Sequence, residues 1–256
     1  MSRYLIGIDV GTTGTKSMLF SDSGRIISHA YSEYPCQTPG TGMVEQNAED
    51  WWRAVVKTVR AITADPQTAK NVAAISLSLQ GGTFVPVDRQ YRPLHPAIVW
   101  SDKRCERQRQ AFLQAFGPEY VYQKTGWHLG PGLNAMQIAW FRENYPDLFE
   151  KTFLFLSVPD YISLRLTGRP VVDISDVGIN QLADIRTGHY DKAIRISSAW
   201  TSRVCRKSVP RARRWADCST ARRRSWDCPD PYCWYPGPMT SMPRCWGQAL
   251  PVRAIS

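Results

Sequence analysis

The chain has 256 residues, 43% of them hydrophobic, which is enough to bury a sizeable core in one large or two small domains. The N-terminus lacks the charged-then-apolar pattern of a secretory signal, and no apolar run approaches the roughly twenty residues that span a bilayer. These features exclude a membrane-spanning protein and predict a soluble, cytoplasmic one.

The formal net charge of +10 is distributed unevenly. Residues 1–194 carry 20 Lys and Arg against 19 Asp and Glu, a net charge of +1, whereas residues 195–256 carry 12 against 3, a net charge of +9. Five of the seven cysteines also lie in residues 195–256, and Cys36 and Cys105 in the body are typical of a reducing compartment. We therefore expect one domain over residues 1–194, followed by a basic tail that is not an independent domain.

The first 194 residues predict an α/β domain with a mixed sheet. Strands at 4–10, 15–21 and 25–31 follow one another directly, with a turn at residues 22–24, as in three consecutive antiparallel strands. Apolar runs predict further strands at 71–79, 83–87, 97–100 and 152–156, with residues 83–90 as a hairpin that leads to 97–100. Apolar periodicity predicts helices at 48–64, capped by Asn47, at 102–116, at 134–144, stopped by Tyr145-Pro146, and at 159–166, ended by Thr167-Gly168. On the first of these helices, we expect Trp52 among the residues that face inward.

The turn after the first strand, DVGTTGTK, combines the elements of a phosphate-binding loop. Its small and hydroxyl residues allow backbone N–H groups and side-chain hydroxyls to approach an anion; they are Gly11, Thr12, Thr13 and Gly14. Asp9 ends the strand and is placed to hold Mg²⁺ through waters, while Lys16 is placed to neutralise a transferring phosphoryl group. On these residues alone, an ordinary hairpin with a Gly-Thr turn, which needs no ligand, is the favoured interpretation.

Further segments extend the pattern and carry a resemblance to the FGGY carbohydrate kinases of the actin/hexokinase-like superfamily. The opening strand and turn resemble the family's first phosphate loop, and residues 42–46 with the following Trp pair resemble its entry into the first long helix. Residues 80–83, 96–104 and 161–176 resemble the family's sugar loop, its Pro-x-Ile-x-Trp-x-Asp-x-Arg stretch and its Leu-Thr-Gly and Ser-Asp segments, in the same order. The resemblance covers residues 4 to about 193 and implies a ribonuclease H-like α/β domain.

This resemblance implies a kinase that transfers the γ-phosphoryl group of Mg·ATP to a hydroxyl of a ketose or polyol, most similar to xylulokinases. Asp9 would organise Mg²⁺, and the residues of the first turn would face the phosphates; for the sugar pocket the implied residues are Gln80, Gly81, Gly82, Trp100, Asp102 and Arg104. The implied partners are a small sugar or polyol and ATP, with no membrane. A homodimer is compatible with the sequence.

Other interpretations of the sugar-pocket residues remain open. Trp100 is equally typical of a core residue, and Asp102 is better placed to cap the helix expected beside it. Arg104 is also placed to pair on the surface with Asp102 or with Glu106. Asp173 and Asp176 are expected to serve a turn.

Two departures separate this chain from the family pattern. Glycerol-kinase-like members carry Gln-Arg-Glu-Thr at the sugar loop and xylulokinase-like members carry Gln-Met-His-Gly, whereas this chain has Gln80-Gly81-Gly82-Thr83. The family's Gly-rich segment with its general-base Asp is also missing, because Asp217, Asp227 and Asp230 follow no Gly-rich strand end. We therefore assign no catalytic base and expect negligible turnover from this chain.

The tail lacks the periodicity of the body and is expected to be disordered. Residues 195–256 contain one Leu, no Phe and no Glu, but five Trp, seven Pro and five Cys. We interpret them as a frameshifted or truncated end of a family member, which sequencing of the coding DNA tests. The cysteines form no CxxC pair, which argues against zinc, and binding of nucleic acid through the Arg and Trp residues is the less favoured alternative. A non-catalytic sugar-binding fragment is the other alternative function.

Overall fold

The computed structural model describes residues 3–168, 170 and 174–197, and the sequence expectations for Asp173 and for nearly all of the tail lie outside this part of the chain. The expected α/β fold with a mixed sheet is confirmed. In the described part no helix is both long and apolar enough to cross a bilayer.

The first sheet contains the three consecutive strands that the sequence predicts. Its four strands lie in the order β3-β2-β1-β5, with bounds β1 (Tyr4–Val10), β2 (Gly14–Ser21), β3 (Ile26–Glu33) and β5 (Val72–Leu79). β1 pairs with β2 and β2 with β3 in antiparallel fashion, whereas β1 and β5 run parallel. A parallel pair needs a crossover connection, and the first long helix lies in it.

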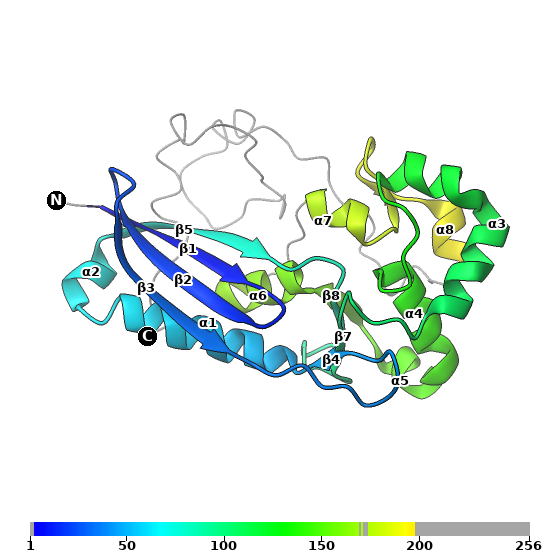
Figure 1. Cartoon of the computed structure of the whole chain (residues 1–256), viewed down its shortest axis with the longest axis horizontal. Coiled ribbons are helices and arrows are strands. Elements are labelled where there is room, and N and C mark those ends of the chain that lie inside the picture. Colours follow the sequence, from blue (N-terminus) through cyan, green and yellow to red (C-terminus); the bar gives the residue numbers. More distant parts are fainter. Residues whose placement is uncertain (1–2, 169, 171–173, 198–256) are drawn as a thin grey trace.

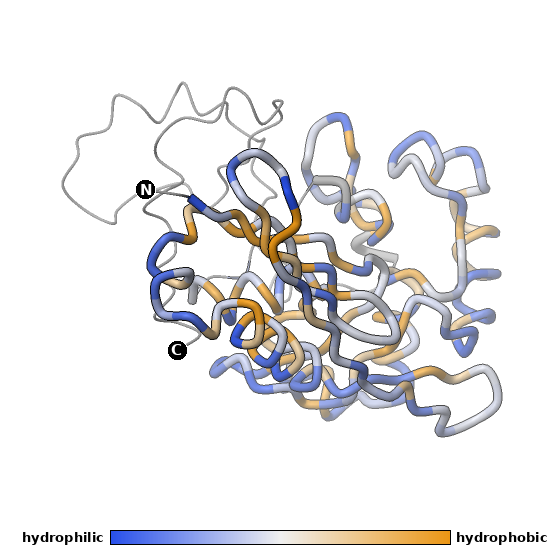
Figure 2. Tube along the Cα trace, turned by 60° about the vertical axis from the view of Figure 1, so that its left-hand side comes forward, coloured by the Kyte–Doolittle hydropathy of each residue, from blue (hydrophilic) through white to orange (hydrophobic). Residues whose placement is uncertain are grey.

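That helix, α1 (Ala48–Ile62), covers one face of the first sheet (Figure 1). Asn47 caps it, because its side chain accepts a hydrogen bond from the backbone N–H of Glu49. Trp51 is fully buried and Trp52 only partly, so the expectation that Trp52 faces inward is half right: the indole at the centre of the core is that of Trp51. Figure 2 shows hydrophobic residues along the strands and hydrophilic residues at the turns that join them.

A second, smaller sheet lies beside the first and has the order β4-β7-β6-β8. Its strands are β4 (Glu45–Gln46), β6 (Phe84–Val87), β7 (Ala97–Ile98) and β8 (Leu154–Ser157), all paired in antiparallel fashion. Phe84 pairs with Ile98, which confirms the predicted hairpin. A second apolar cluster joins Phe84 and Ile98 of this sheet to helical residues that include Phe112, Met136 and Phe149.

Apart from α2 (Pro66–Lys70), which precedes β5, the remaining helices come after β7 in the chain. They are α3 (Glu106–Thr125), α4 (Asn134–Asn144), α5 (Pro146–Lys151), α6 (Val158–Thr167), α7 (Ile174–Ile179) and α8 (Lys192–Ser197), with a short hairpin of β9 (Ala183–Asp184) and β10 (His189–Tyr190). α3 bends at Gly117, whose φ of 73° is not helical, one residue after the predicted end of the helix. Gly168 ends α6 in the left-handed conformation, as its position after Thr167 predicts.

Candidate functional site

Two loops meet at one edge of the first sheet because β1 and β5 run parallel and end together. Val10 and Leu79 are register partners, so residues 11–13 (the first loop) and residues 80–83 (the second loop) leave the sheet side by side. The backbone N–H of Gln80 donates a hydrogen bond of 2.9 Å to the carbonyl of Val10 and so joins the two loops at their base. The structure therefore brings the predicted phosphate-binding and sugar-binding segments together.

The first loop is a tight turn that presents the backbone N–H groups of Thr12 and Thr13 as hydrogen-bond donors. Gly11 donates its N–H to the carbonyl of Gly14 at 3.0 Å, and the Tyr34 hydroxyl donates to the carbonyl of Gly11 at 2.6 Å. Within the described part of the chain the N–H groups of Thr12 and Thr13 donate no hydrogen bond. Burial raises the pKa of Tyr34 to about 12, so its hydroxyl stays a neutral donor that fixes the turn.

Asp9 and Lys16 lie opposite each other at the base of this turn. They are register partners on β1 and β2, and both are exposed, whereas the neighbouring Ile8 and Val10 point into the core. Neither side chain forms an ion pair with any described residue. The described residues also contain no group of three His, Cys, Asp or Glu side chains arranged as metal ligands. A single accessible carboxylate fits Mg²⁺, which keeps several waters and is commonly bound by one or two carboxylates and substrate phosphates.

The hydroxyl of Thr12 links the first loop to the second. It donates its one hydrogen to Oε1 of Gln80 at 3.1 Å and accepts from the indole Nε1 of Trp100 at 3.0 Å. This side chain therefore faces the second loop, so the group of Thr12 that is available to bind an anion is its backbone N–H. Trp100 is 49% exposed, so the interpretation of this residue as part of the core is wrong.

The glycine pair of the second loop leaves no space for side chains. A Cβ at Gly81 would lie 3.0 Å from Oδ1 of Asp176 and 3.1 Å from Ile179, both on α7. Gly82 has a φ of +72°, and a Cβ there would lie 3.1 Å from the Cβ of Trp100. The backbone itself therefore lines this part of the site. Asp176 is buried within α7, so the expectation that it serves a turn is wrong.

Asp102 and Arg104 form a buried ionic cluster behind Trp100. The Arg104 side chain is 3% exposed, and its guanidinium nitrogens lie 2.8 Å from oxygens of both Asp102 and Glu45. Burial alone would lower the pKa of Arg104, but its bonds to these two carboxylates outweigh burial and raise it. The same oxygen of Asp102 that pairs with Arg104, Oδ2, also accepts the backbone N–H of Val44 at 2.6 Å. The pair thus fixes the segment that leads to Trp100.

This geometry corrects two interpretations. Asp102 does not cap a helix, because α3 begins at Glu106 and its cap position is Cys105. Arg104 does not pair on the surface with Glu106, which instead pairs with Arg109. The expected pairing of Arg104 with Asp102 is present but buried, and both side chains find further partners in β4 and the residue before it.

Gln46 is a residue of the site that the residue-level predictions miss. It is 1% exposed on β4, and its side-chain amide contacts Thr12, Gln80 and Trp51. The available signal is its place in residues 42–46, which resemble the family's entry into the first long helix. A buried glutamine needs several hydrogen-bond partners. Those partners lie up to 34 residues away, beyond the reach of any local pattern.

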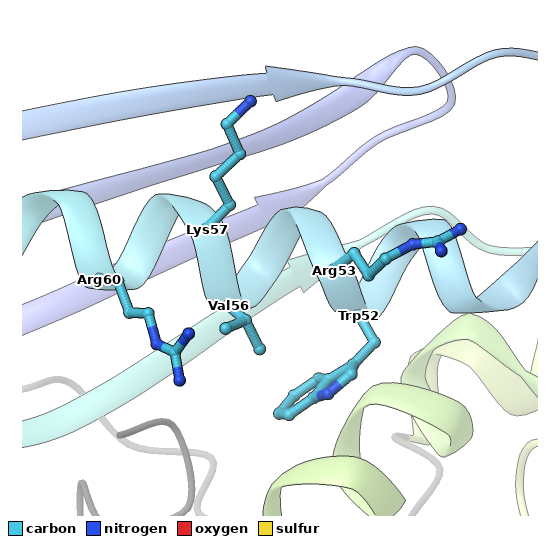
Figure 3. A pocket seen from close by; sticks show the side chains of 5 residues that line it. All are labelled: Trp52, Arg53, Val56, Lys57 and Arg60. Atoms are coloured by element: carbon cyan, nitrogen blue, oxygen red, sulfur yellow. The ribbon is translucent and has the colours of Figure 1, made fainter.

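A separate hollow on the outside of α1 is unrelated to these loops. It is lined by residues of this helix alone, namely Trp52, Arg53, Val56, Lys57 and Arg60. In Figure 3, Lys57 extends toward the strands, whereas Trp52 and Arg60 extend from the opposite side of the helix. Side chains that diverge in this way do not converge on a ligand.

The fold and the paired loops define an α/β domain of the actin- and hexokinase-like class, with a turn suited to an anion beside an accessible acid. Residues 4–212 match the N-terminal domain of the FGGY family of carbohydrate kinases, and the chain belongs to this family. The match continues past the change in composition at about residue 194.

Several relatives share this region. A gluconokinase of Bacillus subtilis (strain 168) is 29% identical over 220 residues, which are 86% of this chain and 42% of that protein. A glycerol kinase of Agrobacterium fabrum is 32% identical over 203 residues, 75% of this chain and 40% of that protein. The crystal structure of a xylulose kinase from Rhodospirillum rubrum has a TM-score of 0.76 and 22% identity over 82% of this chain and 43% of that chain. The chain spans about two fifths of the length of these proteins.

Proposed function

We propose that this chain supplies the phosphate-binding and sugar-binding half of a kinase that transfers the γ-phosphoryl group of Mg·ATP to a hydroxyl of a ketose or polyol. The single observation that supports this most is the meeting of the two loops at the edge of one sheet, joined by the bond from Thr12 to Gln80. Phosphoryl transfer depends mainly on the relative placement of the two reactants and on charge stabilisation, and this arrangement provides the placement.

The roles follow from the geometry of the described residues. The open N–H groups of Thr12 and Thr13 would bind phosphate oxygens, and Lys16 would lower the charge on the transferred group. Asp9 would hold the magnesium ion, which supplies charge neutralisation at the phosphates when bound. These residues bind and orient the nucleotide, and none of them is placed as a base toward the sugar.

The acceptor would lie against the second loop. Gln80 would donate a hydrogen bond to it, Gly81 and Gly82 would let it approach the backbone, and the exposed indole of Trp100 would cover an apolar sugar face. Asp102 and Arg104 would support this pocket from behind, since they are buried and bonded to each other. The relatives include kinases of gluconate, glycerol and xylulose, and we favour a xylulose-like acceptor.

Binding by the 256-residue chain tests the nucleotide half of this proposal. We expect Mg·ATP to raise the melting temperature of the wild type, and Asp9→Asn to abolish the magnesium-dependent part of the shift. Asp22→Asn, which removes an exposed carboxylate from the turn between β2 and β3, is the matched control and should keep the shift. Equal shifts in all three proteins would contradict the assignment of Asp9.

Turnover tests the expectation that this chain has no general base. A coupled assay of ADP release with xylulose, gluconate and glycerol should give no rate above background, and robust ATP-dependent release would overturn that expectation. Stabilisation by a sugar without any response to Mg·ATP would indicate the non-catalytic sugar-binding alternative. Binding to RNA or DNA that weakens steeply with salt and is lost on deleting residues 195–256 would indicate the nucleic-acid alternative.

A further inference from the structure

Gln46 occupies the centre of a hydrogen-bond network that joins both loops to the core. Its Nε2 donates to the carbonyl of Thr12 at 2.6 Å and to Sγ of Cys36 at 3.3 Å. Its Oε1 accepts from Nε1 of Trp51 at 3.1 Å and from Nε2 of Gln80 at 3.1 Å. A side chain that is 1% exposed thus uses both ends of its amide on four partners from four segments.

The directions of the bonds made by the two glutamines follow from the indole of Trp51. An indole N–H only donates, so Trp51 requires the oxygen of Gln46 on its side and the NH₂ group on the side of the Thr12 carbonyl. The Gln46 oxygen also accepts from Nε2 of Gln80, so Oε1 of Gln80 faces Thr12 and takes the hydrogen of its hydroxyl, which itself accepts from the indole of Trp100. Reversing the Gln46 amide would place donors against donors at Trp51 and Gln80.

This order determines how Gln80 meets a ligand. Its Oε1 already accepts from the hydroxyls of Thr12 at 3.1 Å and Thr83 at 3.5 Å, and its Nε2 uses one hydrogen on Gln46. The second hydrogen of Nε2 has no acceptor among the described residues. Gln80 is therefore set as a hydrogen-bond donor, suited to an oxygen that accepts.

We propose that Gln46 is a positioning residue: it fixes the Gln80 amide as a donor toward the acceptor substrate and holds the Thr12 carbonyl, so that the two loops keep one relative placement. The inference rests on the proposed function for the identity of the ligands. Its structural part, the ordering of Gln80 and Thr12 by Gln46, holds in the protein without any ligand.

The support from Trp51 makes this role specific to position 46. Trp51 is fully buried at the start of α1 and packs edge-on against Tyr161 of α6, with ring centroids 5.9 Å apart. The amide of Gln46 is thereby anchored to the core on one side and reaches both loops on the other. A leucine at this position would fill the same volume but make none of the four bonds.

The first experiment uses the ligand-free 256-residue chain labelled with ¹⁵N. In Gln46→Leu, we expect the indole N–H of Trp100, which does not contact Gln46, to shift and to exchange with solvent at least ~10-fold faster because Thr12 is released. Gln108→Leu is the matched control, since Gln108 is 4% exposed on α3 and bonds to Glu143. An unchanged Trp100 signal in a folded Gln46→Leu protein would overturn the inference.

The second experiment separates this inference from the proposed function. Xylulose, gluconate and glycerol are titrated calorimetrically into each protein, with and without Mg·ATP. For the acceptor that the wild type binds, Gln46→Leu should show about 10-fold weaker affinity and Gln108→Leu an unchanged affinity. Gln46→Glu keeps the acceptor oxygen for Trp51 and Gln80 and should restore part of the affinity. Equal affinities in wild type and Gln46→Leu would refute the positioning role, whereas a wild type that binds none of the probes would refute the proposed function alone.

Discussion

Replacing Arg104 by methionine should be among the most destabilising single changes near the site. Methionine keeps an apolar side chain over the ring of Trp140, which the guanidinium carbon covers at 4.9 Å from the ring centroid. It leaves the carboxylates of Asp102 and Glu45 without their counter-ion in a place where the Arg104 side chain is 3% exposed. Removing one partner of a buried ion pair costs roughly 3–5 kcal/mol, which is a large share of the ~5–15 kcal/mol that stabilises a typical domain.

Urea unfolding followed by far-UV circular dichroism measures this loss. With an m value of roughly 2 kcal/mol/M, the midpoint of Arg104→Met should fall by about 2 M. Arg107→Met is the control, because Arg107 is 78% exposed and pairs with Glu143 only on the surface, so its change should stay within ~0.5 kcal/mol. A loss below about 1 kcal/mol for Arg104→Met would refute the reasoning, since it would mean that Asp102 and Glu45 do not need the cation.

Three further outcomes follow from other described residues. Burial raises the pKa of Tyr34 to about 12, so the stability that its neutral hydroxyl contributes is full below about pH 10 and is lost as the pH rises toward 12. The unfolding free energies of wild type and Tyr34→Phe should therefore converge between about pH 10 and pH 12 by up to ~2 kcal/mol. A difference that stays constant over this interval would contradict the assignment. Iodoacetamide should modify the exposed Cys36 and spare Cys105, which is buried and whose thiol pKa is raised by burial; peptide mass spectrometry that finds equal labelling would contradict it. Gly82→Ala should cost about 1–2 kcal/mol more in urea unfolding than Gly24→Ala, because both have positive φ but only the Cβ at Gly82 meets a neighbouring side chain within 3.4 Å; equal losses would argue against crowding there.

Local signals predicted most of the fold. Apolar runs and turn residues predicted β1 to β3 and β5. Asn47 marked the start of α1 and Gly168 the end of α6, and the structure has both helix ends at these residues. The missed helix α5 shows the limit of such signals. In the sequence Tyr145-Pro146 indicates only the end of the preceding helix, but proline is equally suited to the first turn of a helix, and Pro146 begins α5.

The site was predictable only where its residues are contiguous. The loop at residues 11–13 and the residues 80–83 stand out as short patterns, and the parallel pairing of β1 with β5 brings them together. The roles of Asp102 and Gln46 depend instead on partners distant in the sequence, Val44 for the first and Thr12 for the second. When a residue has a plausible local role, such as capping a helix, the sequence gives no indication of a stronger interaction with a residue far away in the chain.

The crowded surroundings of the glycine pair limit how the second loop can be redesigned in this scaffold. A transplanted loop with a larger residue at position 81 would collide with Asp176 and Ile179, which belong to a different stretch of the chain. A chimera that exchanges residues 80–83 alone is therefore expected to distort α7, whereas one that carries residues 174–179 from the same donor protein preserves the fit. Under the proposed function, selectivity for the acceptor would depend on two separate segments, which must be exchanged together.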